Sequence, residues 1–512
     1  MNGPDQYNSC AILDHNLEAG RGDKVAIRWG EDSVTYGELC ARTHAFAAAL
    51  REAGIHREER VLLVLDDSPA WPTAFFGAMR IGAVPVPVSF LDHPQNFAHY
   101  LRDSYARVVV VEAAAADALL GVLGEAVERP VLWSANGRVE GATALEDVLA
   151  AHAGAEVAML QTHRDDMAFW LYSSGSTGRP KGVVHLHHDI PYTCETYAKE
   201  ILEIDEADVT LSTTKLYHAY GMGNNVSFPY WAGASTVLLS GRPRPEPILR
   251  AAQRYRPTLF FSVPTLYNAM VGVAHGGDYD LASVRRCASA AEPLSPVVLR
   301  RWRERFGLDI LDGIGSTEML HIYCSNRPDH IVPGTSGIPV PGYELRLLDE
   351  EDREVPDGEI GNLHVRGDSA HAYYWHQHEK TKATLKGEWF FTGDRYRRDE
   401  AGGYVYEGRA DDMIKVGGLW VSPIEVENVL AEHPAVVEAA AIGIRADETT
   451  RVKAYLVCRE HDREQRALEA ELQEWCKARL RRYEYPHFFT FVDELPKTLT
   501  GKIQRYKLRE LG

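Results

Sequence analysis

The length, composition and charge of the chain exclude several classes of protein. At 512 residues the chain is too long for one hydrophobic core, so we expect at least two domains. The net charge of -18 argues against a general nucleic-acid binder, because such proteins gain affinity from basic surfaces. No run of about 18 consecutive apolar residues is present, so neither a membrane-spanning helix nor a membrane partner is expected.

The N-terminus and the cysteines bear on the compartment of the protein. Residues 1–8 lack both the basic region and the apolar run of a signal peptide, so a cytoplasmic location is the default expectation. The seven cysteines are odd in number, widely scattered and never spaced as Cys-x-x-Cys. We therefore expect reduced cysteines that pack in the interior, and not a zinc site or a disulfide framework.

Short apolar runs alternate with amphipathic stretches between residues 60 and 340. Four of these runs are expected to form β-strands: residues 61–65, 168–172, 236–239 and 258–262. Strands separated by helical segments are typical of sheets that carry helices on their faces. The predicted fold class is therefore α/β, with a large N-terminal domain of helix-covered sheets.

The pattern changes to short strands with Gly, Asp and Pro turns between residues 339 and 406. Residues 340–348 and 361–366 are expected to be strands of a small antiparallel barrel or sheet. This part of the chain predicts a small β-barrel-like subdomain at the end of the N-terminal domain.

The last hundred residues have a third pattern. Ser422, followed by Pro423 and Glu425, is the signature of a helix start, and the helix is expected to reach about Glu432. Two strands, a helix and a third strand are expected to follow, at residues 436–444, 452–459, 464–482 and 488–492. We predict an N-terminal domain of residues 1–408 and a small α+β C-terminal domain of residues 409–512.

A loop rich in Gly, Ser and Thr follows the expected strand at residues 168–172. Residues 173–182 read Ser-Ser-Gly-Ser-Thr-Gly-Arg-Pro-Lys-Gly. Small residues let backbone N–H groups and hydroxyls approach phosphate oxygens, and Lys181 adds positive charge. The loop is not a Walker A motif, because Pro180 precedes the lysine and Gly182 follows it. A flexible surface loop is the alternative interpretation. The candidate phosphate-binding residues are Ser173, Ser174, Gly175, Ser176, Thr177, Gly178 and Lys181.

This loop resembles the phosphate loop of the adenylate-forming superfamily, which contains acyl-CoA synthetases, nonribosomal-peptide adenylation domains and firefly luciferases. Residues 312–318, Asp-Gly-Ile-Gly-Ser-Thr-Glu, resemble the second nucleotide motif of that superfamily. The resemblance implies that Thr317 contacts the nucleotide and that Glu318 is an oxygen ligand for Mg²⁺. Ile314 stands where many members stack a tyrosine on adenine, so this position departs from the pattern.

Two further motifs resemble the ribose site of the superfamily. Residues 389–394, Trp-Phe-Phe-Thr-Gly-Asp, end in Asp394, which the resemblance assigns to the ribose hydroxyls. Arg409, fifteen residues later, would donate to the same ribose. Each residue alone would be read as a turn residue or a surface ion pair. The order and spacing of the motifs favour the nucleotide site.

The C-terminal motif resembles the segment that carries the mobile catalytic lysine. Residues 495–504 read Leu-Pro-Lys-Thr-Leu-Thr-Gly-Lys-Ile-Gln and place Lys502 at that position. With Mg²⁺, Lys502 would stabilise the charge that builds up when a carboxylate attacks the α-phosphorus of ATP. The resemblance also implies that the C-terminal domain rotates about a hinge at Asp411 between two half-reactions. Gly417 and Gly418 would then flank the pantetheine tunnel of coenzyme A, although a simple hairpin turn also explains them.

The resemblance covers essentially the whole chain and is strongest toward the benzoate–CoA ligase branch of the aryl-CoA ligases. Residues 216–224, 313–322 and 417–423 carry it. By that likeness the acyl site is lined by Ala219, Tyr220, Gly315, His321 and Ile322. A short wall of Tyr220 and Ile322 favours a flat ring over a long alkyl chain. His321 is a candidate partner for the substrate carboxylate, and a histidine satisfied in the core is the open alternative.

His218 and a separate group of three histidines are the remaining candidate site residues. His218 occupies a gate position beside the acyl carbon and is a candidate catalytic residue together with Lys502 and Glu318. Benzoate enzymes tend to have phenylalanine there and related aryl-CoA ligases histidine, so benzoate, hydroxybenzoates and aminobenzoates all remain open. The histidines at residues 185, 187 and 188 have only Asp189 nearby, so we do not expect a metal site.

These features predict an AMP-forming acid–thiol ligase that uses ATP, Mg²⁺ and coenzyme A. It would convert a small aromatic carboxylic acid into its adenylate and then into aryl-CoA, with release of pyrophosphate and AMP. The first alternative is a stand-alone adenylation enzyme that loads the phosphopantetheine of a carrier protein. A nucleotide-binding regulator without catalysis and a luciferase-like oxygenase are two further alternatives.

Overall fold

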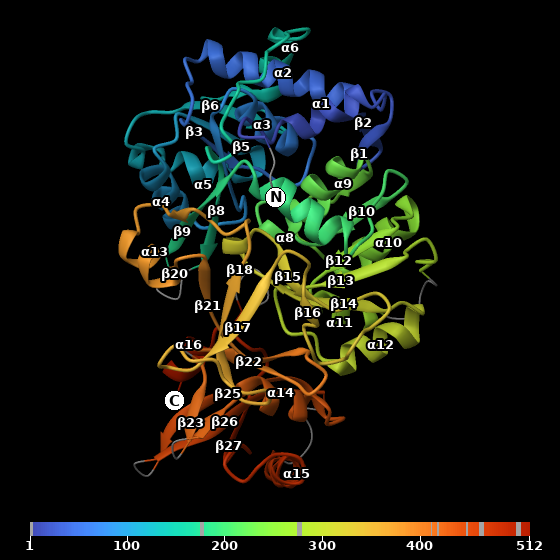
Figure 1. Ribbon diagram of the computed structural model, residues 1–512, viewed down its shortest axis with the longest axis vertical. Coiled ribbons are helices and arrows are strands. Elements are labelled where there is room, and N and C mark those ends of the chain that lie inside the picture. The colour runs from blue at the N-terminus through green and yellow to red at the C-terminus, as the bar shows by residue number, and fades with distance from the viewer. Residues whose placement is uncertain are drawn as a thin grey trace.

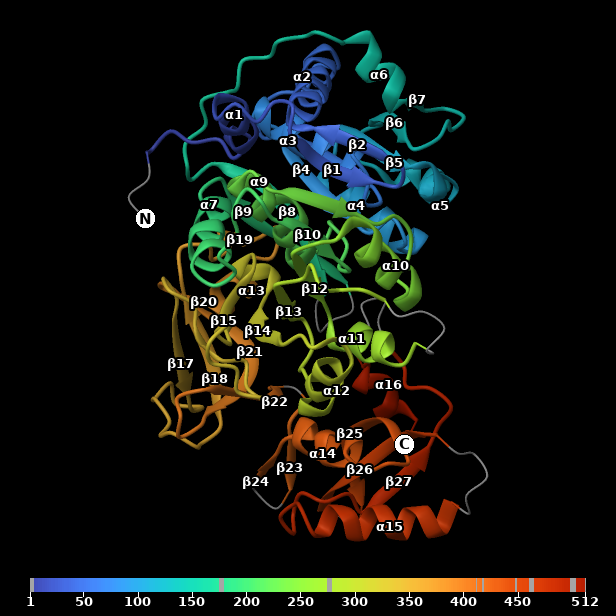
Figure 2. The ribbon, with the colours of Figure 1, turned by 90° about the vertical axis from the view of Figure 1, so that its right-hand side faces the viewer.

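The computed structural model describes residues 4–174, 179–273, 279–410, 412–416, 419–446, 449–459, 465–497 and 503–511. The chain forms a large body from its N-terminal three quarters and a smaller body from its C-terminal residues (Figure 1). The view from the side shows helix α15 at the far end of the smaller body and α2 at the opposite end of the larger one (Figure 2). No helix in the described ranges is long and apolar enough to cross a membrane.

The first sheet is fully parallel and has the strand order β4-β3-β5-β6-β7. Its strands are β3 (Arg60–Val64), β4 (Val84–Val88), β5 (Val108–Glu112), β6 (Val131–Ala135) and β7 (Thr143–Ala144). The valine-rich strands β4, at one edge, and β5, at the centre, are buried along their whole length, as is typical of parallel sheets. Helix α2 (Tyr36–Glu52) packs on α3 (Ala70–Arg80) over this sheet. Thr35 caps α2 in a reciprocal pair of hydrogen bonds with Glu38, which fixes where the helix begins.

The second sheet has the order β16-β15-β14-β13-β12-β10-β11-β1-β2. Its strands are β1 (Val25–Trp29), β2 (Asp32–Thr35), β10 (Val209–Ser212), β11 (Ser235–Leu238), β12 (Leu259–Ser262), β13 (Arg286–Ser289), β14 (Ile310–Gly315), β15 (Ile322–Ser325) and β16 (Ile338–Pro339). The six inner strands β14, β13, β12, β10, β11 and β1 run parallel to one another. Strand β2 at one edge and strands β15 and β16 at the other pair in antiparallel fashion. Helix α11 (Pro264–Val271) connects the neighbouring strands β12 and β13, and α12 (Pro296–Phe306) connects β13 and β14. Helix α10 (Pro245–Tyr255) runs from β11 to β12, which lie on either side of β10. The carboxyl ends of the parallel strands therefore meet at one edge, where ligands bind in sheets of this kind.

Two antiparallel sheets complete the larger body. The first has the order β19-β9-β8 and consists of β8 (Met167–Ser174), β9 (Pro180–Leu186) and β19 (Tyr373–Tyr374). The second consists of β17 (Glu344–Leu348), β18 (Gly361–Arg366), β20 (Leu385–Lys386), β21 (Trp389–Arg398) and β22 (Tyr404–Arg409), with α13 (His378–Thr384) beside it. The predicted helix-covered sheets and the predicted small antiparallel sheet are both confirmed. The strand expected at residues 340–348 begins at Glu344, because residues 341 and 342 form a turn.

The remaining helices of the larger body are short. They are α1 (Ala11–Glu18), α4 (Pro94–Ser104), α5 (Ala116–Leu120), α6 (Leu145–Ala151), α7 (Asp189–Thr193), α8 (Ala219–Met222) and α9 (Phe228–Ala232), with single turns η1 (Ala113–Ala115), η2 (Leu123–Glu125) and η5 (Thr317–Met319). Two segments, η3 (Cys194–Lys199) and η4 (Gly223–Ser227), have π-helical hydrogen bonding. The segment η4 joins α8 to α9 without a break, and π-helical turns occur frequently at functional sites.

The C-terminal body is an α+β unit. It contains the hairpin β23 (Ile414–Val416) and β24 (Leu419–Val421), the sheet β25 (Val436–Ala446), β26 (Thr449–Cys458) and β27 (Phe488–Phe491), and helices α14 (Pro423–Ala431), α15 (Gln465–Lys477) and α16 (Arg505–Glu510). Ser422 begins α14 by accepting from the Glu425 N–H, and its hydroxyl donates to the Glu407 carbonyl of β22 at 2.6 Å. Helix α15 ends at Lys477, five residues before the expected end. The chain continues as a turn in which the N–H groups of Arg479 and Leu480 donate to the Cys476 carbonyl.

Candidate active site

The Gly/Ser/Thr-rich loop joins the two strands of the β8–β9 hairpin. The register pairs Ser173 with Lys181 and Ser174 with Pro180, so the two ends of the loop are held opposite each other. Residues 175–178, which include the predicted phosphate contacts Gly175, Ser176, Thr177 and Gly178, lie outside the described residues. The hydroxyl of Ser173 is buried and has no hydrogen-bond partner within the described part of the chain. A buried hydroxyl without a partner at the entrance of this loop fits a donor to a phosphate oxygen.

Lys181 and Glu318 form a buried ion pair at the base of the hairpin. Nζ of Lys181 lies 2.6 Å from Oε1 of Glu318, and both side chains are about a tenth exposed. Tyr374 of β19 donates its hydroxyl to the same oxygen at 2.9 Å, and its ring lies 3.9 Å from the ammonium. Lys181 comes from β9 and Glu318 from η5, 137 residues later in the chain. Tertiary structure thus brings the first two nucleotide motifs together.

The electrostatics of this pair favour the ionised carboxylate. Burial alone would raise the pKa of Glu318, but the charge and hydrogen bond of Lys181, the nearby His371 and a backbone hydrogen bond together outweigh burial and lower that pKa to about 2. Burial also lowers the pKa of Lys181, and the carboxylate of Glu318 opposes this shift. The carboxylate of Glu318 is therefore ionised at neutral pH. The ionised side chain of Glu318 offers the carboxylate oxygens that a hard divalent cation prefers as ligands.

Two histidines hold the turn that carries Glu318 through hydrogen bonds to its carbonyl groups. Nε2 of His185 lies 2.8 Å from the Thr317 carbonyl, and Nδ1 of the same ring lies 2.6 Å from Asp189. The backbone N–H of His371 donates to the Glu318 carbonyl at 2.7 Å. Leu320, directly after the turn, has a φ of 65°, a conformation that non-glycine residues rarely adopt. A turn held in this way keeps the carboxylate of Glu318 in one position.

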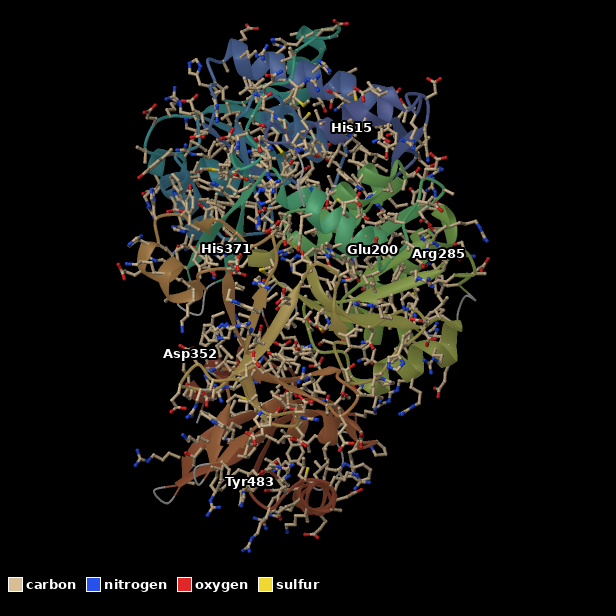
Figure 3. The ribbon with its side chains drawn as sticks, viewed as in Figure 1. His15, Glu200, Arg285, Asp352, His371 and Tyr483 are labelled. Carbon is tan, nitrogen blue, oxygen red and sulfur yellow. The ribbon has the colours of Figure 1, made fainter. Side chains whose placement is uncertain are left out.

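His371 and Tyr374 were missed by the sequence analysis. His371 is buried, its ring nitrogens have no hydrogen-bond partners among the described residues, and burial lowers its pKa to about 3. Figure 3 shows it at the level where the β8–β9 hairpin meets the antiparallel sheet below. The aromatic and histidine-rich run at residues 371–376 was the available signal, since polar aromatic residues rarely cluster without a reason.

Asp394 and Arg409 face each other across two neighbouring strands. They are register partners on β21 and β22, and Nη1 of Arg409 lies 3.1 Å from Oδ1 of Asp394. The same nitrogen donates to the Thr392 carbonyl at 3.0 Å. Gly393 has a φ of +75°, and a Cβ atom there would lie 2.7 Å from Nη2 of Arg409. A glycine at this position therefore lets the guanidinium lie flat against the strand.

The predicted acyl-site residues come together from three elements. Ala219 and Tyr220 begin α8, Gly315 ends β14, and Ile322 begins β15, where it is the register partner of Gly315. The rings of Tyr220 and His321 have centroids 5.4 Å apart. Gly223 is required here, because a Cβ atom on it would lie 2.2 Å from Cδ2 of His321.

His321 is buried among aromatic rings, and one of its nitrogens is already engaged. Nε2 lies 3.2 Å from Oδ1 of Asn224, and burial lowers the pKa of the imidazole to about 3. A neutral imidazole has a single N–H, and here that hydrogen faces the Asn224 oxygen. The predicted donation from His321 to a substrate carboxylate would require this hydrogen bond to break, so it remains a prediction.

A buried cluster of charged residues anchors the segment before His218. Nζ of Lys215 lies 2.7 Å from Asp66 and donates to the Leu239 carbonyl at 2.6 Å. The Leu216 N–H donates to Asp67 at 3.1 Å. Burial raises the pKa of Asp67 to about 7 even though Lys215 opposes the shift. The sequence analysis missed this cluster, although two aspartates directly after the buried strand at residues 61–65 were a usable signal.

Four further predicted residues, besides those of the phosphate loop, lie outside the described ranges. Asp411, Gly417, Gly418 and Lys502 lie outside the described residues, so the predicted hinge, pantetheine tunnel and mobile lysine remain predictions. His218, predicted as a gate, is the residue before α8, and its ring centroid lies 4.5 Å from that of Tyr217.

Comparison with known proteins identifies the family. The model of the AMP-binding enzyme family matches residues 13–375, and that of the AMP-binding enzyme C-terminal domain matches residues 425–502. The benzoate–CoA ligase of Thauera aromatica is 44% identical over 510 residues, which cover 99% of this chain and 96% of that protein. The 4-hydroxybenzoate–CoA/benzoate–CoA ligase of Rhodopseudomonas palustris is 40% identical over 99% of this chain and 94% of that protein.

Solved structures agree with the sequence comparisons. The crystal structure of an anthranilate CoA ligase in complex with anthranoyl-AMP has a TM-score of 0.96 and 39% identity, with 100% of this chain and 98% of that chain covered. A benzoate CoA ligase from Burkholderia xenovorans LB400 has a TM-score of 0.91 and 43% identity, with 98% and 100% covered. The resemblance inferred from the motifs is thus confirmed, and the chain belongs to the AMP-binding enzyme family.

Proposed function

We propose that the protein joins a small aromatic carboxylic acid to coenzyme A at the expense of ATP. The products are aryl-CoA, AMP and pyrophosphate. The observation that carries this proposal is the buried Lys181–Glu318 pair below the phosphate hairpin, in a chain 44% identical to a benzoate–CoA ligase over nearly its whole length. The Asp394–Arg409 pair adds a second polar group of the kind that holds a ribose.

In the first half-reaction the carboxylate of the acid attacks the α-phosphorus of ATP, and pyrophosphate leaves. Two anions must approach each other, so cations at the site lower the barrier. Lys181 supplies a fixed ammonium next to the phosphate loop, and Ser173 supplies a hydroxyl. We assign Lys502 to the attacking and non-bridging oxygens, on the resemblance of its motif alone. The backbone of the loop would bind the β- and γ-phosphates.

Glu318 fits a magnesium ligand. Its carboxylate is ionised, and both Lys181 and Tyr374 approach Oε1, so Oε2 is the oxygen that we assign to the ion. Protein sites usually hold Mg²⁺ with one or two carboxylates plus phosphates of the substrate. The ion would compensate the negative charge of the phosphates.

In the second half-reaction the thiol of coenzyme A attacks the acyl carbon. A carbon–sulfur bond forms, the bond from the acyl carbon to the AMP oxygen breaks, and the thiol proton passes to solvent. The two half-reactions need different groups around the acyl carbon. We assign this exchange of groups to a rotation of residues 409–512 about Asp411. Gly417 and Gly418 would then border the pantetheine arm, and His218 would lie beside the acyl carbon.

The acyl site favours an aromatic acid. Rings of Tyr197, Tyr220 and Phe228 surround His321, with centroid distances of 5.2, 5.4 and 4.4 Å. The named relatives act on benzoate or hydroxybenzoate, and the solved neighbour holds anthranoyl-AMP. These relatives are CoA ligases, so the comparisons favour coenzyme A and do not support a carrier protein as acceptor.

A pyrophosphate-exchange panel tests the proposal. The purified protein is incubated with ATP, Mg²⁺, labelled pyrophosphate and benzoate, hydroxybenzoates or aminobenzoates in turn. Aryl-acid-dependent exchange, followed by formation of aryl-CoA on addition of coenzyme A, is the expected result. No exchange with any acid of a broad panel would favour the regulator. Acylation of a carrier protein but not of coenzyme A would favour the carrier-loading enzyme.

A further inference from the structure

The segment that carries the predicted gate and acyl wall is attached to a buried group of ionisable side chains. This group, the Lys215 cluster, consists of Lys215, Asp66, Asp67 and Glu112, each of which is less than a tenth exposed. Asp66 and Asp67 follow β3, Glu112 ends β5, and Lys215 follows β10. Burying charged groups costs free energy that their pairing barely repays. The cluster therefore points to a role in positioning and not to a gain in stability.

The cluster holds the chain at two consecutive residues. Nζ of Lys215 lies 2.7 Å from Oδ1 of Asp66 and 3.8 Å from Oδ2 of Asp67. The Leu216 N–H donates to Oδ1 of Asp67 at 3.1 Å. The side chain of residue 215 and the backbone of residue 216 are thus both fixed by the aspartates that follow β3.

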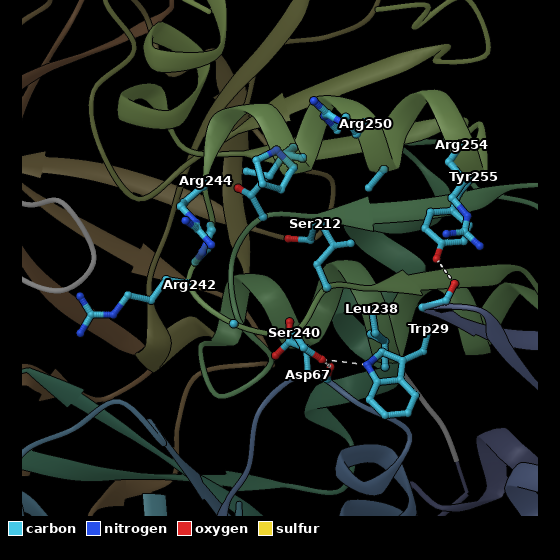
Figure 4. Close-up of a pocket in the computed structure, with 18 residues that line it drawn as sticks. Trp29, Asp67, Ser212, Leu238, Ser240, Arg242, Arg244, Arg250, Arg254 and Tyr255 are labelled. Atoms are coloured by element: carbon cyan, nitrogen blue, oxygen red, sulfur yellow. Dashed lines mark hydrogen bonds between the residues drawn. The ribbon is translucent and has the colours of Figure 1, made fainter. Parts of the chain in front are cut away.

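The carboxylates of the cluster are themselves held by hydrogen bonds from both parallel sheets. The Asp66 N–H donates to Oε2 of Glu112 at 3.2 Å, and the Asp67 N–H donates to Oδ1 of Asp66 at 2.8 Å. From the loop after β11, the Gly241 N–H donates to Oδ2 of Asp66 at 2.6 Å. The Ser240 hydroxyl donates to the Asp67 carbonyl at 3.0 Å, and Figure 4 shows these two residues together at the wall of a cavity. The cluster therefore joins the first parallel sheet to the second.

Two backbone contacts extend from Lys215 to the gate and to α8. The His218 N–H donates to the Lys215 carbonyl at 3.0 Å. A Cβ atom on Gly221 would lie 2.2 Å from the same carbonyl oxygen, so the Lys215 backbone lies directly against α8. Ala219 and Tyr220, two residues of the predicted acyl site, lie between His218 and Gly221 in the chain. A shift of residue 215 would therefore displace the gate and the acyl wall together.

We propose that Lys215 and Asp67 are positioning residues for the gate and the acyl wall. They fix the backbone at residues 215–221, so that Tyr220 and His218 keep one orientation around the acyl carbon. Tyr220 is needed when the acid binds, and His218 is needed when the thiol attacks. A misplacement of about 1 Å can cost an enzyme up to about a hundredfold in rate. This inference rests on the proposed function.

The test compares two substitutions of Asp67 in the full-length protein. Asp67→Ala removes the acceptor of the Leu216 N–H, whereas Asp67→Asn keeps an oxygen in its place. Asp67→Ala should raise the KM for the aryl acid in pyrophosphate exchange about tenfold, and it should slow thioester formation from pre-made acyl-adenylate about tenfold as well. Asp67→Asn should stay within about threefold of the wild type in both assays. The KM for ATP should be unchanged in both variants.

Hydrogen–deuterium exchange measures the anchor itself without any substrate. The Leu216 amide should exchange faster in Asp67→Ala, because its acceptor is lost, and at the wild-type rate in Asp67→Asn. A wild-type exchange rate of this amide in Asp67→Ala would overturn the inference whatever the activity of the variant.

A second variant and a matched control separate positioning from general destabilisation. Lys215→Met/Asp66→Asn removes one charge of each sign, so that no buried charge loses its partner, and it should reproduce both kinetic effects of Asp67→Ala. Arg285→Met is the control. It breaks a buried 2.6 Å ion pair with Asp208, which lies at the opposite end of β10 from Lys215. This variant should lower the melting temperature and leave the KM for the aryl acid unchanged.

The outcomes are decisive in either direction. Wild-type kinetics in Asp67→Ala and in the double variant overturn the inference, as do equal losses in Asp67→Ala and Asp67→Asn. A matching rise in the KM for ATP, or the same kinetic effects in Arg285→Met, shows general destabilisation and overturns it too. If Asp67→Ala does not fold, the double variant decides by the same criteria. Failure of the proposed function differs, because the wild type itself then shows no acid-dependent pyrophosphate exchange.

Discussion

Gly223→Ala tests the structure of the acyl site most directly. A Cβ atom on residue 223 would lie 2.2 Å from Cδ2 and 2.6 Å from Nε2 of His321. Carbon atoms in contact prefer about 3.5 Å, so the imidazole must move by more than about 1 Å. The ring is in contact with Tyr197, Tyr220 and Phe228, and the movement breaks its hydrogen bond to Asn224. Overpacking of this kind costs about 1–3 kcal/mol.

The substitution Gly223→Ala should impair the use of the aryl acid and not the binding of ATP. Because we propose that His321 lines the acyl site, kcat/KM for the aryl acid should fall about 10- to 100-fold in pyrophosphate exchange. The KM for ATP should stay within about twofold, since the nucleotide residues lie on other elements. Gly124→Ala is the matched control, because a Cβ atom there meets nothing within 4 Å and the backbone is not left-handed.

A double variant separates the steric explanation from general misfolding. The His321→Ala substitution removes the ring that the new methyl group meets. The kcat/KM for the aryl acid in Gly223→Ala/His321→Ala should therefore be higher than the sum of the two single effects predicts. A wild-type KM for the acid in Gly223→Ala would refute the reasoning. Strict additivity of the two substitutions would refute it as well.

Three further predictions concern the nucleotide site and the C-terminal segment. The variant Glu318→Gln should lose about 3 kcal/mol of the free energy of unfolding at neutral pH, because the pKa of the buried Glu318 falls from 4.5 to about 2 on folding. Since that pKa is depressed, the contribution is present above the unfolded value and disappears as the pH falls toward 2, so acid-unfolding curves of variant and wild type should converge there. Asp394→Asn and Arg409→Ala should each raise the KM for ATP about tenfold and leave the KM for the acid unchanged, and equal effects on both substrates would contradict the ribose assignment. Lys502→Ala should abolish adenylate formation but spare thioester formation from pre-made acyl-adenylate, and equal loss of both would count against domain rotation.

Local sequence determined much of the fold. Apolar runs such as residues 61–65 and 258–262 became strands because their pattern requires burial. The Ser422–Pro423 signal began α14 because a side-chain cap and a proline act within one helical turn. The phosphate loop was found for a similar reason, since its small residues and Lys181 are consecutive in the chain.

The electrostatic partners at the site were decided by tertiary structure. The Lys181–Glu318 pair spans 137 residues, and Lys215 reaches Asp66 across 149. No periodicity or spacing encodes such contacts, because they depend on how separate sheets pack together. Tyr374 likewise lies in the site only because β19 pairs with β9.

The sequence by itself therefore determined the class of chemistry, because the groups that bind phosphate and ribose lie in short local motifs. Only the tertiary structure decided which side chains are charged, since burial and nearby groups set the pKa of Glu318 in the nucleotide site and burial lowers that of His321. The tertiary structure also explains why a side chain at residue 223 would clash, because the obstructing ring of His321 lies just before β15, nearly a hundred residues away in the chain.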